Sequence, residues 1–191
     1  MKGGEYKYKM TAYLKRGFTL IELLIVIAIL GVLAVVILVA INPQEQLART
    51  RDAGRTSSVT QLGHAMQAYG ASHEGNYIAE SNTWISAAST GLVASGEIAT
   101  TPDLLDYNVG DSGPCTLNAN NGWCYDTDGA TPPNSFIVFA RLESGSNNSR
   151  CTEAGSPNAF VVFDSVSGRG GIVCSGASGP EFVAAGQDFI N

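Results

Sequence analysis

The most constraining feature of the sequence is an apolar run of 24 residues near its N-terminus, Phe18–Ile41. It holds a single charge, Glu22, and from Leu23 onward no side chain in it is polar. A helix of this length measures about 36 Å, enough to cross a hydrocarbon core of about 30 Å. A helix that is apolar on every face is typical of a membrane or of the interior of an assembly. We therefore predict a transmembrane and assembly helix over residues 18–41 that carries the rest of the chain as a soluble domain.

Glu22 is unusual because it lies inside this run, close to its start. A charge in a spanning helix costs up to about 2.5–3.5 kcal/mol at the centre and less near an end, so a retained charge indicates a partner or a function. The helix dipole also favours an anion in the first turn. The alternative is that Glu22 only reaches the lipid headgroups of a simple anchor.

A basic pair and a glycine, Lys15-Arg16-Gly17, precede the run. A secretory signal peptide has the opposite order, with a shorter apolar region followed by small residues and the cleavage site. At the far end of this run, Ala40 is preceded two positions earlier by the bulky Leu38, which makes a poor site of that kind. The order of residues thus favours a protease site before the run.

This layout resembles the type IV prepilin family, whose N-terminal segments are called class III signal peptides. The matching residues are Lys15-Arg16-Gly17-Phe18-Thr19-Leu20-Ile21-Glu22 and the apolar stretch that contains Gly31. The resemblance is strong over residues 15–75 and rests on general architecture beyond them. It implies that prepilin peptidase recognises Lys15 and Arg16, cuts between Gly17 and Phe18, and N-methylates Phe18.

The resemblance also implies assembly of many copies into a helical filament, in which Glu22 neutralises the terminal amine of a neighbouring subunit. An unpaired ammonium buried in a filament core would be costly. Gly31 and Ala34 would let neighbouring helices approach closely. The implied partners are prepilin peptidase, an assembly platform protein, an ATPase and, before assembly, membrane lipid.

The distribution of basic residues indicates which end of the chain lies in the cytoplasm. The leader, residues 1–17, holds five of the 11 basic residues and one of the 17 acidic residues, and positive residues before a span keep that end in the cytoplasm. A chain cut after Gly17 has no lysine and a net charge of −10. Such a chain lacks the clustered cations that grip nucleic acid, so no nucleic-acid partner is expected. We expect a single-pass membrane protein that becomes extracellular after assembly.

An amphipathic continuation of the helix is predicted over residues 42–74. Asn42-Pro43 either kinks this helix or starts a separate one, since proline lacks an N–H donor. Apolar residues then recur at spacings of three and four and predict a stripe that packs on a sheet. A mixed-charge patch before the stripe is either a solvated face or a set of pairs between subunits. The stripe is Val59, Leu62, Ala65, Met66 and Tyr69, and the patch is Glu45, Arg49, Arg51, Asp52 and Arg55.

The extracellular head, residues 75–191, is predicted to contain a loop region followed by a sheet. We interpret residues 77–121 as loop, with a short helix starting at Asn82-Thr83. Runs rich in aromatic and β-branched residues predict strands at 135–142, 158–164 and 172–174. The predicted fold is α+β and pilin-like: a long N-terminal helix packed on a small antiparallel sheet of three or four strands.

Four cysteines lie on the exported side of this topology, which favours disulfides. Of the three possible pairings we prefer Cys115–Cys124, which closes a short loop, with Cys151–Cys174, which joins two neighbouring strands. The alternative is that one or both pairs stay reduced.

No cofactor, metal or catalytic constellation is expected. Asp126 and Asp128 lie in a segment similar to the start of a calcium loop, but Ile137 occupies the position of its last carboxylate, so an acidic turn is favoured. The chain is therefore expected to be a structural subunit of a type IV pilus-like filament and not an enzyme. The alternatives are a pseudopilin of a type II secretion or competence system and an anchored binding module or adhesin that never polymerises.

Overall fold

The computed structural model of the chain describes residues 17–103, 105, 107, 115, 118–151 and 155–190. The chain forms two compact units, Met1–Asn42 and Pro43–Asn191. Lys15 and Arg16 lie outside the described residues.

The described part of the first unit is dominated by one helix, α1, Leu20–Ile41. Asn42 follows in the left-handed conformation, with φ 45° and ψ 75°, and Pro43 is the first residue of the next helix. The structure therefore agrees with the interpretation in which Pro43 starts a separate helix. Proline suits a first helical position because the N–H it lacks would have no helical acceptor there.

The second unit begins with α2, Pro43–Ser72. Val59, Leu62, Ala65 and Met66 are buried in the core, which confirms the predicted stripe, and Tyr69 packs against them. The helix ends in left-handed residues, Glu74 and Gly75, where the Gly75 N–H donates to the carbonyl of Gly70 at 2.9 Å. Glycine is the residue that most readily adopts this left-handed conformation at the end of a helix.

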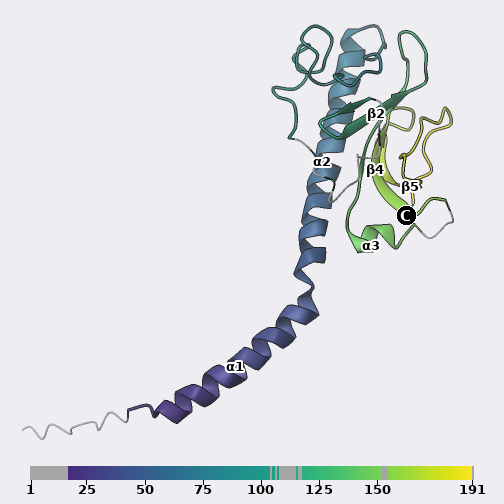
Figure 1. The fold of residues 1–191 in the computed structure, drawn as a ribbon. Helices are drawn as coiled ribbons and strands as arrows, with labels where there is room; N and C mark the ends of the chain where they lie inside the picture. Colours follow the sequence, from purple (N-terminus) through teal and green to yellow (C-terminus); the bar gives the residue numbers. More distant parts are fainter. Residues whose placement is uncertain are drawn as a thin grey trace, which may run out of the picture. The chain divides into compact units, whose positions relative to one another are not determined.

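A single antiparallel sheet packs against α2 (Figure 1). It has five strands in sequence order, one more than the upper bound of the prediction. The added pairing joins β1 to β2 through Asn121-Gly122, both with positive φ, inside a segment interpreted as loop. This dipeptide is a standard two-residue hairpin turn. The strands are β1 Ala119–Asn120, β2 Trp123–Thr127, β3 Phe136–Arg141, β4 Asn158–Asp164 and β5 Arg169–Ser175.

Both faces of the central strands are buried. Phe136, Val138 and Phe163 face the core shared with α2, while the alternate residues Phe139 and Phe160 belong to a second core on the opposite face. That second core is covered by Phe182 and Phe189 of the C-terminal segment. Burial on both faces explains why β3 and β4 are continuous apolar runs without alternation.

The segment at Asn82-Thr83 forms turns, so the short helix predicted there is wrong. Trp84 and Ile85 are fully buried, and the Trp84 ring stacks on Tyr125 with 4.9 Å between the ring centroids. Adjacent side chains on a helix point about 100° apart. Because Trp84 and Ile85 are both buried in the core, an irregular turn is favoured here over a helix. A four-residue helix, α3 Gly145–Asn148, follows β3 and was not predicted.

Candidate functional site

The start of α1 is built around a capping box. Glu22 Oε2 accepts hydrogen bonds from the Thr19 N–H at 2.9 Å and the Thr19 hydroxyl at 2.8 Å, while the Glu22 N–H donates to Thr19 Oγ1 at 3.3 Å. The reciprocal bonds satisfy donors that a helix N-terminus otherwise leaves open. Gly17 and Phe18 precede this box in non-helical backbone, and both are exposed. The Gly17–Phe18 bond is therefore exposed in non-helical chain, immediately before helix α1.

None of the 22 residues of α1 is buried by the rest of the chain. Its length and apolar composition are sufficient to cross a bilayer. A Cβ atom added at Gly31 would meet no atom within 4 Å. A surface this large and apolar needs lipid or other protein chains to cover it.

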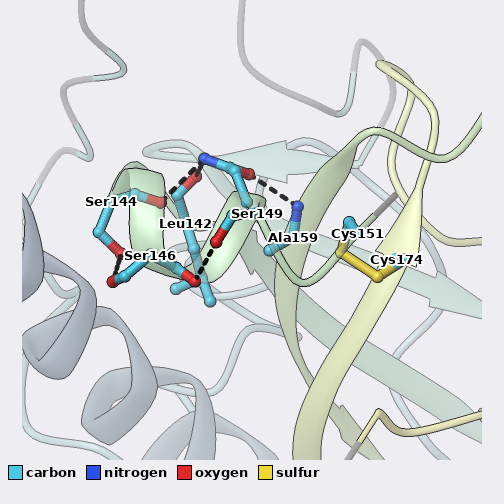
Figure 2. Close-up of a disulfide and its surroundings, with 8 residues drawn as sticks. Leu142, Ser144, Ser146, Ser149, Cys151, Ala159 and Cys174 are labelled. Carbon is cyan, nitrogen blue, oxygen red and sulfur yellow. Dashed lines mark hydrogen bonds between the residues drawn. A yellow bond between two sulfur atoms is a disulfide. The ribbon is translucent and has the colours of Figure 1, made fainter. Parts of the chain in front are cut away.

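The four cysteines form two disulfides, Cys115–Cys124 and Cys151–Cys174, with Cα atoms 5.8 Å and 5.4 Å apart. Figure 2 shows the Cys151–Cys174 bond beside α3. There the Asn148 side chain donates to the Ser144 carbonyl at 3.2 Å and accepts from the Ala159 N–H at 2.9 Å. The disulfide and this asparagine together join the segment around α3 to β4 and β5.

Two carboxylates of α2 hold the backbone that leads into α3. Asp52 accepts from the N–H groups of Glu143 and Ser144, at 2.7 Å and 3.0 Å. Glu45 accepts from those of Gly145 and Ser146, at 2.9 Å and 3.1 Å. These backbone hydrogen bonds lower the pKa of Glu45 to about 2. Four successive N–H groups are thus satisfied by one face of α2.

Arg55 completes this junction from the same helix. Its side chain is 3% exposed. The guanidinium donates to the Arg141 carbonyl at 2.8 Å, pairs with Glu143, and lies 4.9 Å from the centroid of the Tyr107 ring. Asp52 and Arg55 belong to the mixed-charge patch noted in the sequence. Both are buried and bind groups of the same chain, so they do not form a solvated face. The interpretation of a solvated face is therefore wrong for these two residues.

Asp126 and Asp128, the candidate calcium ligands, bind backbone. Asp126 accepts from the Phe182 N–H at 2.7 Å, and Asp128 accepts from the N–H groups of Ala130 and Asn134. Burial and the neighbouring Glu80 carboxylate raise the pKa of Asp126. Within the described ranges, no three metal-ligating side chains converge.

Comparison with known proteins bears on the N-terminal segment. A family model described as the prokaryotic N-terminal methylation motif matches residues 14–38. No curated protein and no solved structure gave a significant match. The match indicates a structural subunit that is processed by prepilin peptidase, and it fits a membrane anchor. Residues 14–38 of this chain therefore carry the class III signal peptide of type IV pilins and pseudopilins.

Proposed function

We propose that this chain is a subunit of an extracellular type IV pilus-like filament. One observation carries the proposal: the methylation motif coincides with a helix whose side chains are all exposed and whose only charge caps its first turn. The chain would be made as a single-pass precursor with a cytoplasmic N-terminus. It would then leave the membrane by joining the base of a growing filament, with energy from a partner ATPase acting through an assembly platform protein.

Processing would occur at the Gly17–Phe18 bond. A protease needs extended backbone to reach a peptide bond, and both residues are exposed ahead of α1. The leader, residues 1–17, would supply Lys15 and Arg16 for recognition by prepilin peptidase and would be released. The new N-terminus would be Phe18, methylated by the same enzyme. Helix α1 would begin two residues later, so cleavage would leave its capping box complete.

Glu22 would pair with the terminal amine of a neighbouring subunit. Its two bonds to Thr19 both use Oε2, and Oε1 has no partner among the residues that the structure describes. A carboxylate can accept more than two hydrogen bonds, so the capping box and an intermolecular ammonium can be satisfied together. The pair would remove both charges from an otherwise apolar helical core.

The first test is the intact mass of the chain in sheared extracellular filaments. We expect a polypeptide that begins at Phe18, carries one added methyl group, and is four hydrogens lighter than the reduced form because of its two disulfides. A chain that still begins at Met1 and stays in the membrane fraction would contradict the proposal. It would favour an anchored binding module or adhesin that does not polymerise.

The second test separates processing from assembly. Glu22→Gln keeps the size of the side chain and an acceptor for the capping box, but it removes the charge. We expect the variant to be cut and methylated yet absent from filaments, whereas Glu22→Asp retains partial assembly. Normal assembly of the Gln variant would overturn the role of Glu22. A processed wild-type chain that supports secretion or DNA uptake without forming surface filaments would identify a pseudopilin.

A further inference from the structure

The C-terminal segment, residues 176–190, covers the face of the sheet opposite α2. Phe182 and Phe189 pack on the second core, which includes Phe139, Phe160 and Val173. A Cβ atom added at Gly171 would overlap the Phe189 ring, so this glycine lets the ring lie directly on β5. Apolar packing therefore holds the segment to the sheet at Phe182 and Phe189.

Polar contacts fasten the same segment at three points. The N–H of Phe182 donates to Asp126 at 2.7 Å, and the N–H of Gln187 donates to Asp164 at 3.1 Å. Asp164 is fully buried, and it also accepts from the N–H of Val166 in the turn after β4. The third contact is the N–H of Ile190, which donates to the carbonyl of Ile172 at 2.8 Å.

This last contact lies at the free edge of the sheet. β5 is the terminal strand, and Ile172 is its central residue. Because the N–H and C=O of one strand residue point the same way, Gly170, Ile172 and Cys174 direct their backbone groups away from β4. Ile190 forms an isolated bridge with Ile172, and the Arg169 guanidinium lies 4.7 Å from the centroid of the Phe189 ring. Ile190 thus occupies the middle of an edge that another strand could use. Figure 1 shows the C-terminal segment beside β5.

We propose that residues 187–190 form an edge guard that prevents β5 from pairing with β5 of a second copy of this chain. An exposed edge is a template for strand addition, and proteins commonly cover it. Two β5 strands running antiparallel about Ile172 would place Arg169 opposite Ser175 and Gly170 opposite Cys174, so no like charges meet. The arrangement is self-complementary, as a two-fold interface requires. A second copy is therefore the occupant that fits the edge once the guard is displaced.

The test uses the full chain in detergent micelles, which keep α1 covered. Phe189→Ser combined with Ile190→Pro removes the ring and the N–H donor of the guard. We expect self-association, measured by light scattering against protein concentration, to rise at least about tenfold. The matched control is Val183→Ser in the same segment, where the side chain is 46% exposed and touches no guard residue in the described contacts. It should behave as wild type.

A third substitution identifies the edge as the contact. Ile172→Pro removes an outward N–H, together with the Ile172 side chain that packs on the core shared with α2. Adding it to the double variant should restore the monomer while the backbone pairing of β4 with β5 persists. Association that survives Ile172→Pro, or a double variant that stays monomeric, would overturn the proposal. Hydrogen exchange of β3 amides reports whether the head remains folded. If the double variant loses that protection, Ile190→Pro alone must still raise association, because it leaves the Phe189 packing in place.

Discussion

Arg55 is the residue on which the junction between α2 and the segment after β3 depends. Replacing it with methionine keeps most of the apolar stem but removes the cation from Asp52 and the Arg141 carbonyl, and it leaves Glu143 paired with Arg51 alone. Breaking one partner of a buried ion pair costs about 3–5 kcal/mol. We expect Arg55→Met to lower the free energy of unfolding by about that amount, measured by urea denaturation of the full chain in detergent.

Arg49→Met is the matched control for this prediction. Arg49 pairs with Glu45 one helical turn away, but half of its side chain is exposed. Exposed pairs of this spacing contribute little to stability. Its unfolding midpoint should stay close to that of the wild type, and an equal loss in both variants would show that burial of Arg55 is not the cause.

The depressed pKa of Glu45 predicts a pH dependence at the start of α2. The folded state favours the ionised carboxylate, so its contribution is complete above the pKa of the unfolded chain, about 4.3. It is lost as the pH falls toward the folded value of about 2. The stability difference between wild type and Glu45→Gln should therefore be largest near pH 6 and should vanish near pH 2. A difference that does not change with pH would rule out the ionised form as the acceptor of the 145–146 amides.

For single residues, the sequence predicted the roles of a contiguous motif better than it predicted which side chains bind each other. Lys15 to Glu22 could be assigned roles because their order along the chain is itself the signal. Asp52 and Arg55 could not, since their partners are backbone groups and Glu143, about 90 residues further along the chain. Spacing on one helix contains no information about which loop the fold brings to it.

We expect replacement by alanine to have opposite effects on stability at two glycines of α2. A Cβ at Gly63 would overlap the Phe163 ring of β4, whereas a Cβ at Gly54 would meet nothing within 4 Å. Gly63→Ala should destabilise by about 1–3 kcal/mol through overpacking. Gly54→Ala should stabilise by about 0.5–1 kcal/mol, because alanine is the better helix former. The measurement is urea denaturation of both variants. A gain in stability at Gly63 would mean that α2 lies too far from β4 for a methyl group to touch the Phe163 ring.

Helices and strands could be predicted from the sequence where a run of patterned residues was long. The stripe of α2 and the runs of β3 and β4 have enough residues to identify both type and position. The pairing of β1 with β2 was missed because two residues have no periodicity, although Asn121-Gly122 offered a turn signal. The turn at Trp84 was misread since its tertiary anchors, Tyr125 above all, override a weak local preference for helix.

For the head as a whole, the Cys151–Cys174 disulfide predicts a large stability effect. It closes a separation of 23 residues and joins the segment after α3 to β5. Restricting an unfolded chain by a loop of this size is worth about 3 kcal/mol. Replacing both cysteines with serine should lower the unfolding free energy by about that amount, measured without reductant. An unchanged value would show that the unfolded chain already keeps these two segments close.

The whole molecule was predictable in outline, an apolar helix followed by an α+β head, because hydropathy and β-rich runs set that division. The role of residues 176–190 was not. Phe182 and Phe189 are too sparse to form a pattern, and only a sheet buried on its first face creates the second face that they cover.

The carboxylates of Glu45 and Asp52 give the head a mechanical property. If the chain is pulled by its N-terminal helix, force passes along the backbone through Pro43 and reaches Glu45 first, then Asp52, and only afterwards the apolar contacts that start at Val59. Four hydrogen bonds to successive amides would have to break before the core is strained. These hydrogen bonds therefore lie at the point where tension would enter the domain, ahead of the sheet.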